Sequence, residues 1–250
     1  MDQRDTDSGA SGRGAADRDD MDGHDFIPAS PRPAAGAGND GAGVQFGPGS
    51  VTEDDVRRAV SAFARQEARR PGEQSSVGSA VALAVSTRDG VPGIWLTRRS
   101  PALRKHPGQF ALPGGRMDPG EDAPTAARRE LTEELGVALP DCAVLGLLDD
   151  YPTRSGYTMT PVVLWAGADR VTTANPGEVA EVFFVPFDEL DVEPLFDRIP
   201  ESQRPVIKLP WRGGYLHAPT AAVIYQFREV VLHGEHTRVA DFEQPVFAWR

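Results

Sequence analysis

The segment from residue 115 to 137, GRMDPGEDAPTAARRELTEELGV, restricts the fold more than any other part of the sequence. It predicts a helix that Asp122 caps, that tolerates Pro124 in its first turn and that ends at Gly136. Its last turns carry three glutamates at spacings of three and four residues: Glu130, Glu133 and Glu134. At about 100° per residue, these side chains share one face of the helix.

This placement of acids is unfavourable for an ordinary helix, because the helix macrodipole disfavours anions near the C-terminal end. Each like-charge pair at this spacing costs about 0.2–0.5 kcal/mol on an exposed helix. One explanation is a solvated charged face that Arg128 and Arg129 neutralise. The other is a site for hard divalent cations such as Mg²⁺ or Mn²⁺, which prefer carboxylate oxygens as ligands.

The complete spacing of the segment favours the cation site. Five residues separate Gly115 from Glu121, and seven more separate Glu121 from the run RELTEELGV at 129–137. This pattern resembles the Nudix box at every fixed position. The resemblance implies an α/β protein with the Nudix fold, an α/β/α sandwich around a central mixed β-sheet. It also implies an enzyme that uses Mg²⁺ or Mn²⁺ to hydrolyse a nucleoside diphosphate linked to another moiety.

The resemblance assigns roles to individual side chains. The residues that it places at the metal are Glu130, Glu133, Glu134 and Gly115. The residues that it assigns to catalysis are Arg129, Glu130, Glu133 and Glu178. Arg129 is expected to orient the glutamates through charge-assisted hydrogen bonds. Glu121 is expected to be structural, and Gly115 lets the backbone approach the metal.

A basic loop precedes the box, within the stretch LTRRSPALRKHPGQFALPGG at 96–115. This stretch resembles the signature found before the box in coenzyme A pyrophosphatases, with Leu112 where that family has Phe. Coenzyme A carries a diphosphate and a separate 3′-phosphate, and a compact cationic loop on an acidic protein would steer and hold such an anion. The predicted substrate-binding residues are Arg99, Arg104, Gly108 and Gln109. A basic loop that only offsets nearby acids is the alternative.

Two later segments extend the resemblance, SGYTMTPV at 155–162 and NPGEVAEVF at 175–183. Glu178 lies in a loop before a predicted strand, where it would help with metal binding or water activation, or would simply cap a turn. Pro152 follows the box by 15 residues, a position where Nudix ADP-ribose pyrophosphatases often have proline. Cleavage of ADP-ribose or another nucleotide sugar therefore stays open. A non-catalytic nucleotide-sensing module on the same fold is a further alternative.

Composition excludes several other classes of protein. The chain has 250 residues and a formal charge of −11, which gives no general footprint for duplex nucleic acid. No apolar run approaches the roughly 20 residues that span a bilayer. Cys142 is the only cysteine, so a disulfide framework is excluded and a reducing cytoplasm is the default location. A small molecule is the expected partner, without nucleic acid or membrane, and a homodimer stays open.

The chain divides into four predicted parts. Residues 1–50 hold nine Asp, four Arg and 10 of the 26 glycines, a composition typical of a disordered acidic tail. Residues 51–76 form a helix and a linker, and the helix is expected to begin at Thr52 and stop near Arg70. Residues 77–233 form the Nudix domain, and residues 234–250 are a C-terminal extension. Within the domain, strands are expected at 79–86, 94–98, 143–148, 158–165 and 179–185, and a further helix at 220–232.

Overall fold

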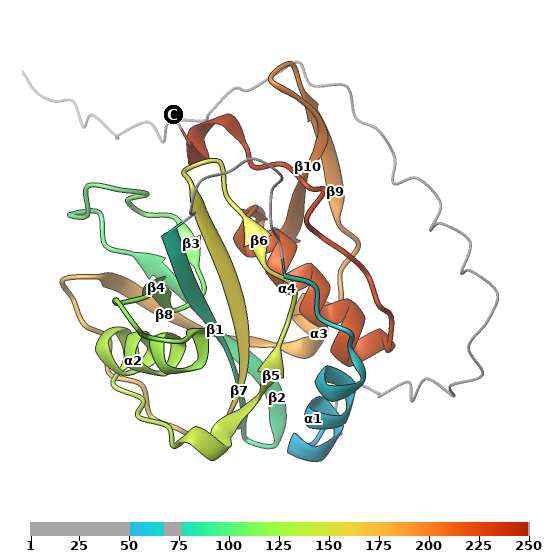
Figure 1. Ribbon diagram of the computed structural model, residues 1–250. Coiled ribbons are helices and arrows are strands. Elements are labelled where there is room, and N and C mark those ends of the chain that lie inside the picture. The colour runs from blue at the N-terminus through green and yellow to red at the C-terminus, as the bar shows by residue number, and fades with distance from the viewer. Residues whose placement is uncertain (1–50, 68–76, 250) are drawn as a thin grey trace, which may run out of the picture.

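A computed structural model describes residues 51–67 and 77–249 (Figure 1). The predicted disordered tail at 1–50 and the linker residues 68–76 lie outside this described part of the chain.

The central feature is a mixed β-sheet built on two long parallel strands, β1 (Val77–Arg88) and β7 (Tyr157–Ala168). The strand order is β3 (Phe110–Ala111), β2 (Val91–Arg99), β1, β7 and β5 (Val144–Leu147). Three further strands pair beside this path: β4 (Gly114–Arg116) with β1, β6 (Tyr151–Pro152) with β7, and β8 (Val179–Pro186) with β2. All of these pairs other than β1–β7 are antiparallel, which confirms the predicted mixed sheet.

Helices cover both faces of the sheet (Figure 1). Helix α2 (Ala123–Leu135) packs on one face, and α1 (Glu53–Ala62), α3 (Phe187–Leu190) and α4 (Thr220–Arg228) lie on the other. The alternation along β1 explains this arrangement, because successive side chains of a strand point to opposite faces. Val81, Leu83 and Val85 join the core beneath α4, whereas the alanines at 80, 82 and 84 face α2. The small alanines allow α2 to lie close to the sheet.

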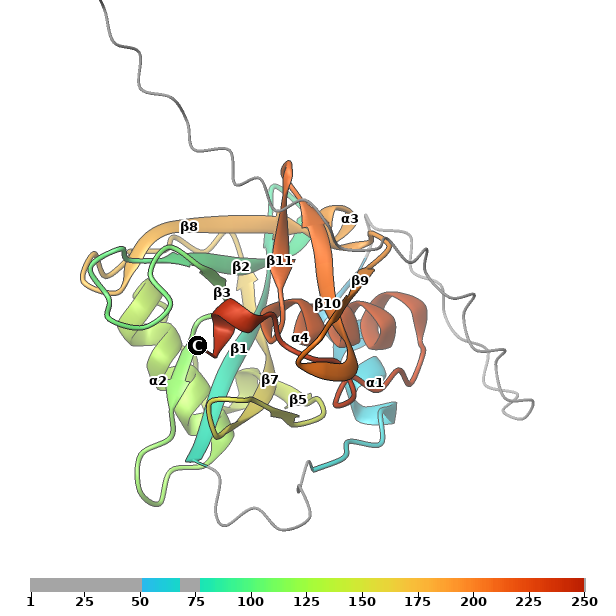
Figure 2. The same cartoon turned by 90° about the horizontal axis from the view of Figure 1, so that it is seen from above.

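A second sheet was not predicted from the sequence. It is antiparallel and consists of β9 (Leu195–Ile199), β10 (Ser202–Trp211) and β11 (Gly214–His217). Figure 2 shows it beside α4, on the far side of β1 from α2. The predicted helix at 220–232 corresponds to α4, which continues into a π-helical turn at Glu229–His233.

Helix α1 is shorter than the sequence predicts. Thr52 caps it as expected, but it ends at Ala62 rather than near Arg70. The reason is that the backbone and side chains beyond Phe63 bond to the main domain instead of to the helix. The Arg65 Nε donates to the Leu148 carbonyl oxygen at 3.1 Å, and the Gln66 N–H donates to the Asp149 carboxylate at 2.6 Å.

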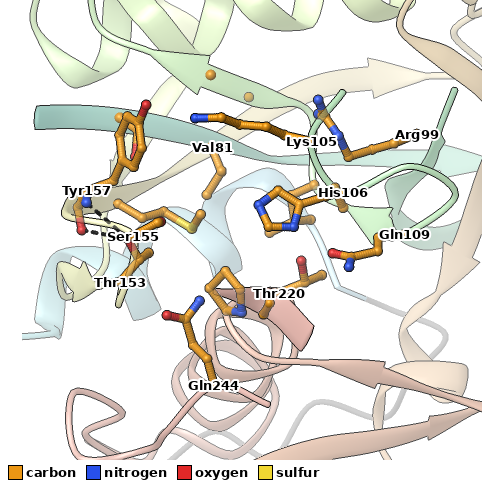
Figure 3. A pocket seen from close by; sticks show the side chains of 18 of the residues that line it. Val81, Arg99, Lys105, His106, Gln109, Thr153, Ser155, Tyr157, Thr220 and Gln244 are labelled. Atoms are coloured by element: carbon orange, nitrogen blue, oxygen red, sulfur yellow. Dashed lines mark hydrogen bonds between the residues drawn. The ribbon is translucent and has the colours of Figure 1, made fainter. Parts of the chain in front are cut away.

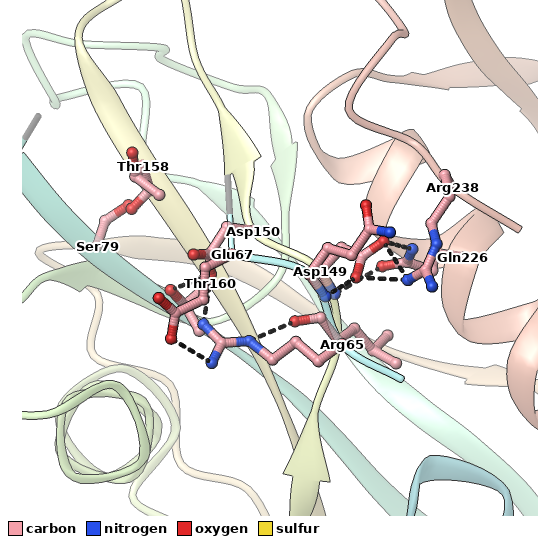
Figure 4. Close-up of polar contacts among 11 residues, drawn as sticks. Arg65, Glu67, Ser79, Asp149, Asp150, Thr158, Thr160, Gln226 and Arg238 are labelled. Carbon is pink, nitrogen blue, oxygen red and sulfur yellow. Dashed lines mark hydrogen bonds and ion pairs between the residues drawn. The ribbon is translucent and has the colours of Figure 1, made fainter. Parts of the chain in front are cut away.

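The same contacts belong to a buried polar network around Asp149 and Asp150 (Figure 4). The Asp149 carboxylate also accepts from Gln226 Nε2 at 2.9 Å and from Arg238 Nη1 at 2.8 Å. Asp150 accepts from Arg65 at 2.8 Å and from the Thr160 hydroxyl at 2.7 Å. The network therefore joins the segment after α1, the end of β5, helix α4 and the C-terminal region.

Candidate active site

Helix α2 begins and ends at the residues that the sequence predicts. The Asp122 side chain accepts from the Thr125 N–H at 2.9 Å, and Gly136 ends the helix in a left-handed conformation with φ of 68°. The apolar face of α2 is buried against the sheet and consists of Ala126, Ala127, Leu131 and Leu135. This leaves Glu130 and Glu134 on the side of the helix that points toward β4.

Three carboxylates converge beside β4: those of Glu130, Glu134 and Glu178. Each offers an oxygen that lies within 4.8 Å of the oxygens of the other two. Glu178 reaches this acid cluster from the loop before β8. Glu133 points outward instead, with half of its side chain exposed, and Arg129 binds it at 3.1 Å. The structure thus places Glu178 in the cluster and Glu133 at its edge.

Arg129 holds the acids in position. Its Nε and Nη2 each donate to one oxygen of Glu121 at 3.0 Å, and its Nη1 donates to Glu130 at 2.8 Å. Glu121 is itself fixed, since it accepts from the Asp118 N–H at 2.9 Å. Paired hydrogen bonds of this kind fix the plane of a guanidinium. Arg129 is therefore placed to position these acids, and Glu121 determines its orientation.

The acid cluster fits a divalent cation. Glu134 is 3% exposed, and its Oε2 has no hydrogen-bond partner among the described residues. Burial raises the pKa of Glu134 to about 8; Arg99 opposes this shift, and Glu130 and Glu178 add to it. Burial likewise raises the pKa of Glu130. Buried carboxylates without enough positive charge around them are the donors that Mg²⁺ or Mn²⁺ would compensate.

Gly115 borders this cluster so closely that a side chain there would require the Glu130 carboxylate to move. A Cβ at this position would meet both carboxylate oxygens of Glu130. The absence of a side chain thus lets the Glu130 carboxylate lie against the backbone of β4.

A cavity of about 310 Å³ opens next to the acid cluster, and Gly115 and Arg99 border both (Figure 3). Its cationic lining residues are Arg99, Lys105 and Arg116, and the His106 imidazole lies beside them. Its uncharged polar lining includes Gln109, Thr153, Ser155, Tyr157, Thr220 and Gln244. Figure 3 shows Arg99 and Lys105 along one side, and Thr153, Thr220 and Gln244 along the other.

The predicted substrate-binding residues divide between the cavity and its surroundings. Arg99 and Gln109 line the cavity, and the Arg99 Nε is buried without a partner among the described residues. Arg104 is exposed and does not line the cavity. Gly108 shapes the loop, with φ of 70°. The adjacent His106 lines the cavity instead, and burial together with Arg99 and Lys105 lowers its pKa.

These features can be compared with known proteins. Residues 77–209 match the model of the NUDIX domain family, which covers more than half of the chain. The chain belongs to the Nudix family. This membership confirms the predicted fold, and the curated relatives that the chain matches are named as Nudix hydrolases.

Two curated Nudix relatives show how far the similarity extends. The chain is 34% identical over 148 residues to Nudix hydrolase 3 of Caenorhabditis elegans, covering 57% of this chain and 62% of that protein. It is 37% identical over 146 residues to the uncharacterized Nudix hydrolase NudL of Pectobacterium atrosepticum, covering 54% and 73%. The chain thus spans less than two thirds of the C. elegans relative. Among solved structures, a Nudix hydrolase of M. smegmatis, RenU, is 24% identical, with a TM-score of 0.40 over 63% of this chain and 87% of its own.

The cavity extends beyond the part of the chain that matches the Nudix model. Pro219, Thr220, Gln244 and Ala248 line it, although the match ends at residue 209. Sequence analysis missed these residues, because no motif marks them and the region 234–250 has no periodic pattern.

In the described structure, no helix is long and apolar enough to cross a membrane.

Proposed function

We propose that this Nudix protein hydrolyses the diphosphate bond of coenzyme A or acyl-coenzyme A to 3′,5′-ADP and 4′-phosphopantetheine or its acyl form. The observation that carries the proposal is the cavity in which a cationic side adjoins the acid cluster and an uncharged side lies opposite. A substrate with several phosphates at one end and a neutral arm at the other has the same distribution of charge.

The cationic side supplies groups for the phosphates. The unpartnered Nε of Arg99 is a buried donor that a phosphate oxygen would satisfy. Lys105 and His106 add donors from the same loop, and Lys105 is free to follow the 3′-phosphate because its side chain is exposed. This assigns to Lys105 the contact that the sequence suggested for Arg104.

Glu130, Glu134 and Glu178 would hold Mg²⁺ or Mn²⁺, which when bound supplies electrophilic stabilisation of the diphosphate. Arg129 fixes the carboxylate of Glu130, so that the cluster is preorganised before substrate arrives. Glu178 enters the cluster from the loop before β8, where it can accept a proton from an attacking water. Attack forms one P–O bond as the bridging P–O bond breaks, and Glu133 remains outside, where it helps to anchor Arg129.

The test is to incubate the full chain with coenzyme A and Mg²⁺ or Mn²⁺ and to identify the products by mass. Release of 3′,5′-ADP is expected, with loss of several orders of magnitude in turnover for Glu134→Gln and no turnover in EDTA. Thermal unfolding of the variant must remain cooperative, so that the lost turnover can be attributed to the metal site and not to misfolding. Near-normal turnover of Glu134→Gln would overturn the metal assignment.

A matched pair of variants tests the phosphate contact. Lys105→Ala should raise the KM for coenzyme A about tenfold, the loss typical of one charge-assisted hydrogen bond, with little effect on dephospho-coenzyme A. Arg104→Ala, one residue away and outside the cavity, is the control. Cleavage of ADP-ribose but not coenzyme A would favour the nucleotide-sugar alternative, and binding without metal-dependent turnover would favour a sensing module.

We also propose that the protein functions in a reducing cytoplasm.

A further inference from the structure

The C-terminal segment 239–249 forms a fixed wall of the cavity. Glu243 is 1% exposed and binds two arginines, Arg154 at 2.6 Å and Arg204 at 2.8 Å. The Tyr151 hydroxyl donates to the Phe242 carbonyl oxygen at 2.9 Å. These contacts hold the segment against the turn between β6 and β7 and against β10, so its side chains have defined positions.

Gln244 is the polar side chain that this wall presents to the cavity. It is 3% exposed, and its Oε1 accepts from the backbone N–H of Arg154 at 2.6 Å. Because a backbone N–H can only donate, this contact fixes which end of the amide is the oxygen. The Nε2 must therefore point away from Arg154, and Figure 3 shows it directed into the cavity.

The two N–H donors of this Nε2 have no acceptor among the described residues, although the other polar groups on the same side are engaged. The Thr153 hydroxyl donates to the Tyr157 carbonyl oxygen at 3.0 Å and lies 3.0 Å from the Ser155 hydroxyl. The Thr220 hydroxyl donates to the Phe110 carbonyl oxygen at 3.4 Å. The Nε2 therefore faces the cavity as a donor that is not used within the described structure, so a ligand that brings an acceptor can form a hydrogen bond here.

The surroundings define the chemistry of that ligand. Apolar side chains line the same cavity, including Val81, Leu112, Met159 and Ala248. On the side of the cavity opposite Arg99 and Lys105, the Gln244 donor lies among apolar and already bonded groups, which suits an acceptor on a mainly apolar arm. An amide carbonyl meets this requirement, whereas a sugar with many hydroxyls would leave most of them unpaired.

We propose that Gln244 is a specificity-determining residue that donates a hydrogen bond from Nε2 to an amide carbonyl in the non-nucleotide arm of the substrate. The inference rests on the proposed function, in which that arm is pantetheine, and it extends substrate recognition to a segment beyond residue 209.

Two variants separate the donor from the anchor. Gln244→Glu keeps an oxygen for the Arg154 N–H but replaces the donor with an acceptor, whereas Gln244→Met removes both. Each should raise the KM for coenzyme A about tenfold, with kcat changed less than twofold. Trp249→Phe is the control, because it removes the bond from Trp249 Nε1 to the Gln244 carbonyl oxygen and keeps an aromatic ring beside Arg154, while the Gln244 side chain is unchanged. Equal KM values for the wild type and both Gln244 variants would overturn the proposal.

Binding of 4′-phosphopantetheine by the full chain in EDTA, measured by calorimetry, tests the same contact without turnover. The dissociation constant should rise about tenfold in both Gln244 variants and stay unchanged in Trp249→Phe. If these shifts occur while coenzyme A is not cleaved, the proposed function fails and the recognition stands. If coenzyme A is cleaved but no variant changes its KM or the dissociation constant, the recognition fails and the function stands.

Discussion

Replacing Glu243 with Gln should make the stability of the protein less dependent on pH. Burial alone would raise the pKa of Glu243, but bonds from Arg154, the Gln244 N–H and Arg204 outweigh it and lower the pKa from 4.5 to about 2. A shift of about 2.5 units corresponds to about 3 kcal/mol in the free energy of unfolding. Because the folded pKa is the lower one, this contribution is complete above about pH 5 and is lost as the pH falls toward 2.

The size of the pH effect follows from the two pKa values. At pH 7 the ionised Glu243 contributes the full amount, whereas at pH 3 only about 1.4 kcal/mol remains. The Gln side chain does not titrate, and the cost of leaving Arg154 and Arg204 without their anion is nearly constant over this range. The difference in unfolding free energy between wild type and Glu243→Gln should therefore narrow by about 2 kcal/mol from pH 7 to pH 3.

Urea denaturation of both proteins at the two pH values measures this difference. Comparing the proteins at each pH cancels the titration of all other groups, provided that the m-values agree. A gap that is the same at pH 7 and pH 3 would refute the argument, because it would show that Glu243 has an ordinary pKa in the folded protein.

Two further predictions concern the site and the polar network. Gly115→Ala should lower kcat/KM about 100-fold, because its Cβ would displace the Glu130 carboxylate and a misplacement of about 1 Å has an effect of that size. Gly214→Ala is the control, since a Cβ at that position has room. Comparable activity of the two variants would contradict the reasoning. Asp149→Asn should lower the unfolding free energy by about 3 kcal/mol, because it leaves the Arg238 charge without its buried partner. Chemical denaturation at pH 7 checks the second prediction, and a loss below 1 kcal/mol would show that the network contributes little.

The parts of the fold that sequence analysis predicted are those with strong local signals. The cap at Asp122, the glycine after α2 and the apolar run of β1 each act through near neighbours, so their boundaries were close to those observed. The end of α1 depends instead on hydrogen bonds that Arg65 and Gln66 donate to Leu148 and Asp149. These partners lie 83 positions further along the chain, so no local sequence pattern contains them.

The candidate site divides in the same way. The face shared by Glu130 and Glu134 follows from helix geometry, and the spacing to Arg129 was informative for the same reason. The outward direction of Glu133 was not evident, because Arg129 attracts it and the cluster is completed by Glu178 from another element. Gln244 had no signal, since its role depends on a single backbone N–H of a distant turn.

The two faces of β1 have different consequences for the molecule. On the side of α4, the strand contributes Val81, Leu83 and Val85 to the larger core, so truncation there should be visible mainly as lost stability. On the side of α2, the alanines act as a spacer that sets the height of the helix above the sheet, and with it the reach of Glu130 and Glu134 toward β4. One face of β1 thus stabilises the core, and the other sets the distance between α2 and the sheet. A methyl group added at Ala82 would move the carboxylates of Glu130 and Glu134 away from β4 while most of the fold remained in place.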